Sequence, residues 1–173
     1  VKISKTRVWT TQDSYPSSSS TSALYSFRSK LGGQFDGNIA HLLSTVPANN
    51  GGVAYVGVLC AKNYGVAYSN IRNTFKQFPT YSWTVEVVAH EMGHNFGSQH
   101  TQSCDWPGGP IDGCVPSEGG CPRGPAPNGG GTIMSYCHLT NYGIDFQKGF
   151  GSLPGNLIRS KYQSATCLST VEG

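Results

Sequence analysis

The sequence contains few charged residues and no long apolar run, and both absences limit what the protein can be. Charged residues make up 12% of the 173 residues, the formal net charge is +3, and no basic run occurs. A charge this mild does not favour nucleic-acid binding. No apolar stretch approaches the roughly 20 residues of a membrane-spanning helix. We therefore expect no nucleic-acid or membrane partner, and one domain with its core around one cleft.

Two common motifs are also missing. No Cys-x-x-Cys pair occurs, so the six cysteines lack zinc-knuckle spacing, and no Gly-x-Ser-x-Gly marks a serine hydrolase. An even number of cysteines in a chain rich in Gly, Ser and Asn favours three disulfides and an oxidising compartment. The alternative is a reduced cytosolic protein with scattered core thiols. The spacing of the cysteines leaves their connectivity open.

The segment from His90 to His100 carries the strongest chemical signal. On a helix, His90 and His94 are one turn apart and share a face, so both imidazoles can bind one metal ion. Glu91 lies next to that face, within reach of a metal-bound water. Gly97 can adopt a positive φ and end the helix, which lets His100 return as a third ligand. Three protein ligands leave one tetrahedral position open, as in a catalytic zinc site. The alternative is an ordinary amphipathic helix with surface or core histidines.

A methionine downstream extends this pattern. His-Glu-x-x-His-x-x-Gly-x-x-His followed by a Met-containing turn is the metzincin signature, and Met134 stands in the expected place. The chain resembles the metzincin zinc endopeptidases, and within them the reprolysin type, the adamalysin-like catalytic domains of ADAM proteases and snake-venom metalloproteinases. The resemblance runs from Arg7 to Cys167. The segments that carry it are His41-Leu42-Leu43, Gly51-Gly52-Val53-Ala54-Tyr55-Val56-Gly57-Val58-Leu59-Cys60 and His90-Glu91-Met92-Gly93-His94-Asn95-Phe96-Gly97.

Two residues depart from the reprolysin pattern. Thr101 follows the third histidine, where that branch usually has Asp. Tyr136 lies two residues after Met134, which is similar to astacins and serralysins, whose tyrosine can act as a switchable metal ligand. Tyr136 is either such a ligand or hydrogen-bond donor, or a buried tyrosine packed against the cysteine-rich loop.

The resemblance implies an α/β (α+β) metzincin fold. A mixed twisted sheet with long helices would lie above the cleft, and a loop-rich, disulfide-stapled subdomain below it. We expect a single catalytic domain over residues 1–173, divided into an upper subdomain (1–97) and a lower one (98–173). The resemblance also implies a Cys60–Cys167 disulfide. Residues 1–5 show no export leader, so we expect a secreted, extracellular mature form whose export signal and pro-segment have been removed. Family members usually have a strand and a helix before the equivalent point, so the resemblance also raises the alternative that an N-terminal part of the usual domain is missing. The resemblance further implies a monomer.

The implied activity is hydrolysis of peptide bonds in proteins by a zinc-bound water that Glu91 activates as general base. His90, His94 and His100 would hold one catalytic zinc ion. The pattern of residues 52–59 fits an interior strand as well as an edge strand, but the resemblance favours an edge strand, along which the substrate would bind as an extended strand. A calcium ion occurs in this family, but no loop here is clear enough to assign one. The alternatives are a catalytically silent binding or adhesion domain and a structural zinc or toxin module.

The spacing of apolar residues predicts where helices and strands form. An apolar stripe of Val88, Met92 and Phe96 is expected to anchor the second helix to the core. His41 is expected to be a satisfied core histidine, and His138 a structural or pocket-wall residue. The expected strands are 3–11, 53–59 and 65–71, the helices are 23–31, 81–96 and 155–164, residues 36–43 are a strand or short helix, and 98–131 are irregular.

Overall fold

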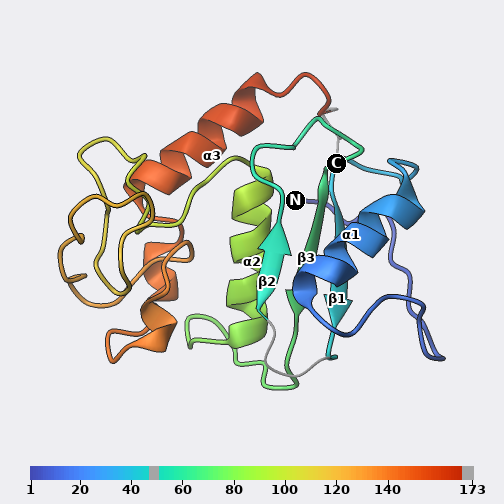
Figure 1. Ribbon diagram of the computed structural model, residues 1–173, viewed down its shortest axis with the longest axis horizontal. Helices are drawn as coiled ribbons and strands as arrows, with labels where there is room; N and C mark the ends of the chain where they lie inside the picture. The colour runs from blue at the N-terminus through green and yellow to red at the C-terminus, as the bar shows by residue number, and fades with distance from the viewer. Residues whose placement is uncertain (47–50, 169–173) are drawn as a thin grey trace.

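The computed structural model describes residues 1–46 and 51–168, and it shows a small mixed sheet between helices (Figure 1). Residues 169–173 of the predicted lower subdomain lie outside this range. Within the described residues no helix has the length and apolar character to cross a bilayer. The elements in chain order are α1 (Ser20–Leu31), β1 (Ala40–Ser44), β2 (Gly52–Ala54), β3 (Val66–Asn70), α2 (Trp83–Asn95), the 3-10 helices η1 (Cys137–Leu139) and η2 (Phe146–Lys148), and α3 (Ser152–Ser164).

The sheet has the order β1-β3-β2, with β1 parallel and β2 antiparallel to β3. Ala40 lies opposite Val66, and Gly52 lies opposite Ser69. All five residues of β3 are buried, as expected for a central strand covered on both faces. β2 stands at the end of the strand order and is therefore an edge strand, as the resemblance implied. The mixed α/β class is confirmed.

Helix α1 packs on one face of the sheet. Ser19 caps its N-terminus, where the side chain accepts a hydrogen bond from the backbone N–H of Ser22, and so the helix begins three residues before the predicted start. Gly32 ends it with a φ of 52°. Alternate residues of the sheet point toward α1 and build the main core. This core consists of Ala23, Leu24, Phe27, Leu42, Val66 and Tyr68.

Helix α2 packs on the opposite face and is tied to the sheet by polar contacts. The Ser69 hydroxyl donates to the Val87 carbonyl at 3.3 Å, and the Asn95 amide donates to the Val66 carbonyl at 3.2 Å. The prediction that an apolar stripe anchors this helix to the core was wrong. Val88, Met92 and Phe96 are only partly buried, whereas the face with the histidines and Glu91 is buried.

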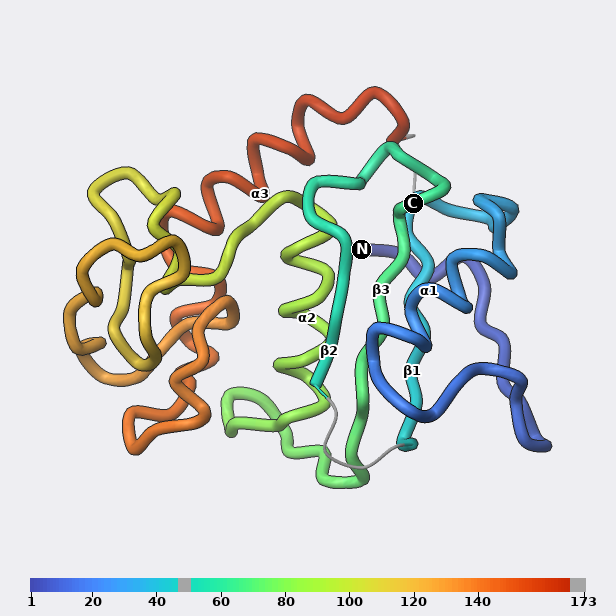
Figure 2. The backbone as a smooth tube through the Cα atoms, in the orientation of Figure 1, coloured from blue at the N-terminus to red at the C-terminus, as the bar shows by residue number. Residues whose placement is uncertain are grey.

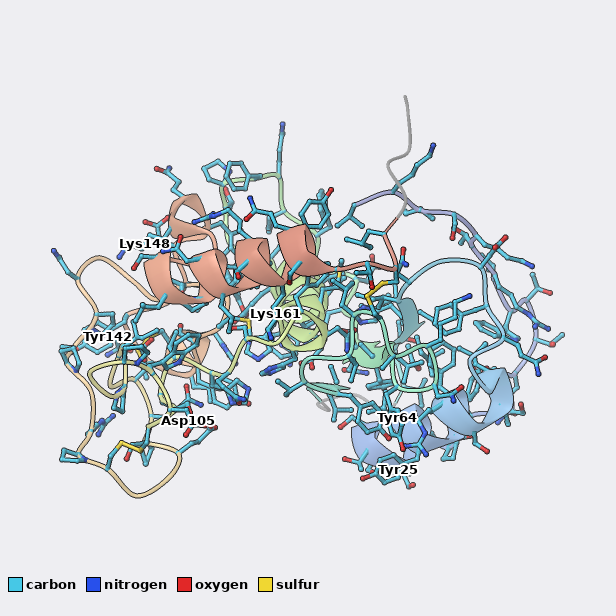
Figure 3. The ribbon with its side chains drawn as sticks, turned by 90° about the horizontal axis from the view of Figure 1, so that it is seen from above. Tyr25, Tyr64, Asp105, Tyr142, Lys148 and Lys161 are labelled. Atoms are coloured by element: carbon cyan, nitrogen blue, oxygen red, sulfur yellow. A yellow bond between two sulfur atoms is a disulfide. The ribbon has the colours of Figure 1, made fainter. Side chains whose placement is uncertain are left out.

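The chain after α2 forms an irregular, cysteine-rich half. Its loops gather beside α2, on the side away from the sheet, and α3 runs across one end of the molecule (Figure 2). The irregular character predicted for 98–131 is confirmed. Sulfur–sulfur bonds are visible among the side chains in Figure 3. The disulfides are Cys60–Cys167, as the resemblance implied, Cys104–Cys121 and Cys114–Cys137.

Two predicted strands need correction. Residues 3–11 form no strand, because this exposed segment has no neighbouring strand to share a hydrogen-bond ladder with in the described structure. The strand predicted for 53–59 ends at Ala54. Beyond it, the backbone N–H groups of Gly57 and Val58 donate to the carbonyls of His94 and Asn95 at 2.8 and 2.9 Å. The second half of that segment therefore caps the end of α2 instead of extending the sheet.

Candidate metal centre

Helix α2 places two of the predicted ligands on one buried face. His90 and His94 are four residues apart, and both side chains are buried. The helix ends after Asn95, and Gly97 adopts a φ of 100°, which a residue with a Cβ rarely tolerates. This turn reverses the chain and brings His100 back toward the helix. The predicted role of Gly97 as helix terminator is thus confirmed.

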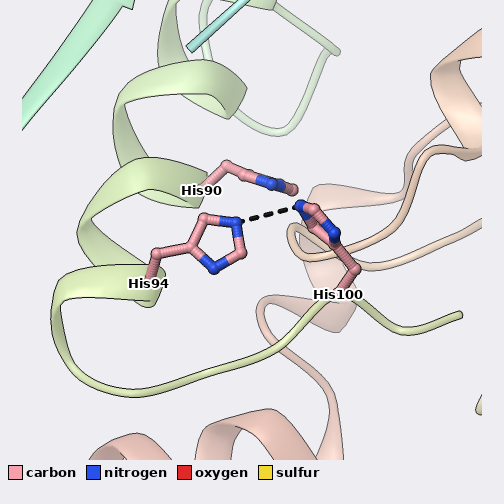
Figure 4. A group of neighbouring side chains, drawn as sticks. All are labelled: His90, His94 and His100. Carbon is pink, nitrogen blue, oxygen red and sulfur yellow. Dashed lines mark hydrogen bonds between the residues drawn. The ribbon is translucent and has the colours of Figure 1, made fainter. Parts of the chain in front are cut away.

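The three histidines come together at one point (Figure 4). One ring nitrogen from each of His90, His94 and His100 lies within 4.8 Å of the other two. The Nε2 atoms of His94 and His100 are 3.0 Å apart. One other group in the described structure has similar spacing, Asp112 with Cys114 and Cys137, but its two sulfurs are bonded to each other.

Each histidine is oriented by an oxygen at its other nitrogen. Nδ1 of His90 lies 2.7 Å from the Ile133 carbonyl, and Nδ1 of His94 lies 2.8 Å from the Ser98 carbonyl. A carbonyl can only accept, so both Nδ1 atoms must carry the hydrogen. Each Nε2 is then a bare lone pair unless the ring is doubly protonated. Such oriented imidazoles are typical of metal-binding histidines.

Burial keeps the rings neutral. It lowers the pKa of His90 well below its ordinary value, with the neighbouring His94 and His100 adding to the effect. Burial also lowers the pKa of His94 to about 4, again with a contribution from His100. Nε2 of His94 accepts a hydrogen bond from Nε2 of His100 when His100 carries its hydrogen there; when both nitrogens are bare, they repel each other at 3.0 Å unless a cation lies between them. With Zn–N bonds of 2.0–2.1 Å, tetrahedral geometry places ligand nitrogens about 3.3 Å apart. The donor set therefore fits a zinc ion.

The carboxyl of Glu91 lies under the edge strand. The side chain is 4% exposed, and its Oε2 has no hydrogen-bond partner within residues 1–46 and 51–168. Burial raises the pKa of this carboxyl to about 8. A Cβ added to Gly52 would lie within 3.0 Å of the Cγ, Cδ and Oε1 atoms of Glu91. The carboxyl therefore occupies the space that glycine leaves at β2.

Met134 and Tyr136 complete the surroundings of the histidines. Met134 is fully buried and packs against Gly93, where an added Cβ would lie 2.5 Å from its sulfur. The Tyr136 hydroxyl lies 3.1 Å from Nε2 of His100. Burial, followed by the negative charges of Glu118, Glu91 and Glu86, raises the pKa of Tyr136 to about 12. A neutral phenol beside a bare Nε2 donates its hydrogen to that nitrogen.

The remaining histidines lie outside the cluster. Nε2 of His41 lies 2.8 Å from the Ser69 hydroxyl, but the residue is only partly buried and its Nδ1 has no hydrogen-bond partner among the described residues, so the prediction of a satisfied core histidine is met only at Nε2. Nδ1 of His138 lies 2.9 Å from Oε1 of Glu86, a carboxylate that also accepts a hydrogen bond from Tyr81 at 2.5 Å. His138 is thus part of a buried polar group behind the site.

Sequence reasoning missed two residues of the site. Gly52 was noted only as part of a strand, yet it sets the space for Glu91. Glu118 lies on the irregular loop, and its carboxylate contacts Nδ1 of His100 at 2.9 and 3.0 Å. No periodicity connects Glu118 to the histidines. The available signal was chemical, since a metal-binding histidine needs an acceptor at its second nitrogen.

The comparison with known families agrees with this geometry. Residues 1–144 match the reprolysin-type family model described as metallo-peptidase family M12. The match covers most of the 173 residues, and it includes the helix with His90 and His94, the returning His100 and the Met134 turn. The chain therefore belongs to the reprolysin-type metallo-peptidases of family M12, zinc-dependent enzymes that act on proteins or peptides.

Proposed function

We propose that the protein is a secreted endopeptidase in which His90, His94 and His100 bind one catalytic zinc ion and Glu91 is the general base. The observation that carries the proposal is the group of three histidines with their ring nitrogens close together. Glu91 directly follows the first of them in sequence, and its buried Oε2 has no hydrogen-bond partner in the described structure. A bound zinc ion would supply Lewis-acid activation of water and of the scissile carbonyl. One catalytic domain over residues 1–173 is part of the same proposal.

Glu91 would carry the proton through the reaction. The positive charge of a bound zinc ion would favour the ionised form of the buried Glu91 carboxyl. Its Oε2 would then accept a proton from the attacking water, whose oxygen forms the new bond to the carbonyl carbon. The same oxygen then delivers the proton to the amide nitrogen as the C–N bond breaks. Tyr136 lies beside the proposed metal site, because its hydroxyl is 3.1 Å from Nε2 of His100. The Tyr136 hydroxyl is suited to donate a hydrogen bond to the negative oxygen that develops on the carbonyl.

The substrate would bind along β2. This strand pairs only with β3 among the described strands, so its other edge is available to an extended peptide. Gly52 of that strand lies directly against Glu91. A peptide added at this edge would therefore run past the proposed base. Secretion is supported by the three disulfides, which persist in oxidising compartments.

Glu91→Gln tests the proposal. We expect this variant to keep zinc, because Glu91 is not a ligand, and to lose roughly 10²- to 10⁴-fold in cleavage of a denatured protein substrate. Removing zinc from the parent protein with a chelator should abolish cleavage, and adding zinc back should restore it. Equal cleavage by Glu91→Gln and the parent would refute the mechanism. Zinc bound without any cleavage by the parent would favour a binding domain.

A further inference from the structure

His100 differs from the other two histidines of the site because its second ring nitrogen contacts a carboxylate, that of Glu118. His90 and His94 are oriented by backbone carbonyls, but His100 faces both carboxylate oxygens of Glu118 at 2.9 and 3.0 Å. We propose that Glu118 is a positioning residue that holds His100 in the tautomer and orientation needed to bind metal. This inference rests on the proposed metal site, and it assigns a role to a residue outside the zinc motif.

His100 needs such a partner more than the other two ligands do. His90 and His94 lie on a buried helix, whose backbone fixes their position. His100 lies beyond the end of that helix, on irregular chain, and its side chain is 19% exposed. In a neutral imidazole either nitrogen can carry the hydrogen. An acceptor at Nδ1 keeps the hydrogen there and leaves Nε2 free, facing His94 and Tyr136.

Glu118 is itself held in place through its side chain and its backbone. The buried Gln102 donates its side-chain amide to Oε1 of Glu118 at 2.9 Å. The backbone N–H of Glu118 donates to the Gln102 carbonyl at 3.0 Å, and the N–H of Cys104 donates to the Glu118 carbonyl at 2.8 Å. The Cys104–Cys121 disulfide closes the loop that contains Glu118. The carboxylate is thus fixed in an otherwise irregular segment, although its side chain is 47% exposed.

A carboxylate does more at this position than a carbonyl would. Its charge strengthens the hydrogen bond from Nδ1 and makes Nε2 a better electron-pair donor. It also offsets part of the positive charge that a metal ion brings to the site. Loss of such a partner typically costs 10- to 100-fold in metal affinity. The effect should be largest when both the acceptor and the charge are removed.

Zinc affinity measured by competition with a chromogenic chelator tests the role of Glu118 without any assay of cleavage. Glu118→Ala should bind zinc roughly 10- to 100-fold more weakly than the parent. Glu118→Gln keeps an acceptor oxygen without the charge, and we expect it to recover part of the loss. Asp105→Asn is the matched control, because Asp105 is exposed in the same disulfide-closed loop and loses the same charge. It should bind zinc as the parent does.

The tautomer of His100 gives a second, independent readout. Nitrogen-15 NMR of the metal-free protein should show the hydrogen on Nδ1 in the parent and in Glu118→Gln, and a mixed population in Glu118→Ala. His90 and His94 should keep their tautomers in all variants, which excludes general unfolding. Parent-like zinc affinity and an unchanged His100 tautomer in Glu118→Ala would overturn the proposal. If His94→Ala left zinc affinity unchanged, the three-histidine site itself would be wrong, which is a different outcome.

Discussion

Gly52→Ala should impair the proposed base without touching the proposed metal ligands. The added Cβ would lie 2.5 Å from Cδ of Glu91. Carbon atoms in contact prefer a separation of about 3.5–4.0 Å, so either the carboxyl or β2 must move by about 1 Å. Gly52 does not have a positive φ, so the backbone itself accepts alanine. The effect of the substitution therefore arises from the contact with Glu91.

The expected loss follows from this displacement. Misplacing a catalytic group by about 1 Å can lower the rate on the order of 10²-fold. Overpacking a buried site costs about 1–3 kcal/mol in the free energy of unfolding. We therefore expect kcat/KM for a peptide substrate to fall by roughly 10²-fold in Gly52→Ala, while zinc affinity stays close to that of the parent. Gly51→Ala is the control, because an added Cβ at Gly51 would meet nothing within 4 Å.

A double-mutant cycle decides whether Glu91 is the cause. In a Glu91→Ala background the clashing atoms are gone, so adding Gly52→Ala should no longer lower the free energy of unfolding. Urea denaturation of the four proteins measures this coupling without any assay of activity. Two results would refute the reasoning: a kcat/KM for Gly52→Ala within about twofold of the parent, or the same destabilisation in both backgrounds.

Two further predictions concern buried side chains at and away from the metal centre. Burial lowers the pKa of His41 from 6.5 to about 4. Between these pH values the unfolded chain binds a proton that the folded protein excludes. The free energy of unfolding should therefore fall as pH falls, by up to about 3 kcal/mol. Urea denaturation at pH 7 and pH 4 should show a smaller loss for His41→Gln, and equal losses would contradict this account. Tyr136→Phe removes a hydroxyl that lies 3.1 Å from Nε2 of His100. We expect kcat to fall about 10- to 100-fold, with little change in zinc affinity. An unchanged kcat would mean that Tyr136 is only a packing residue.

The helix that carries His90 and His94 could be predicted from the sequence because the residues that define it are close together in the chain. The pairing of His90 with His94 depends only on helical periodicity, and the end of the helix depends only on the backbone freedom of Gly97. The same reasoning placed α1 and α3 within three residues of their observed bounds. The strand predicted for 65–71 agrees with β3 to within one residue at each end, but local patterns cannot tell whether a segment has a neighbouring strand to pair with. Residues 3–11 alternate weakly in sequence but have no ladder partner among the described strands.

The contacts that complete the site could not be read from the sequence for the same reason. Glu118 reaches His100 across 18 residues of irregular chain, and Gly52 meets Glu91 across 39 residues. The burial of α2 was also misjudged, because apolar periodicity assumes that the polar face is the exposed one. Here His90 contacts the Ile133 carbonyl of the disulfide-bonded half and Glu91 lies against Gly52 of β2, so the polar face is buried.

The geometry of a helix explains why His100, the third proposed ligand, needs a different kind of support. A helix rises about 1.5 Å per residue, so the next position on the same face after His94 would lie about 11 Å along the axis from His90. No single ion can be reached by all three positions at bonds near 2 Å. The helix must therefore end before the third ligand, and Gly97 ends it. Beyond that point His100 loses the support of helical hydrogen bonds. The Glu118 carboxylate, in a loop closed by Cys104–Cys121, supplies the fixed contact that the helix supplies to the other two histidines.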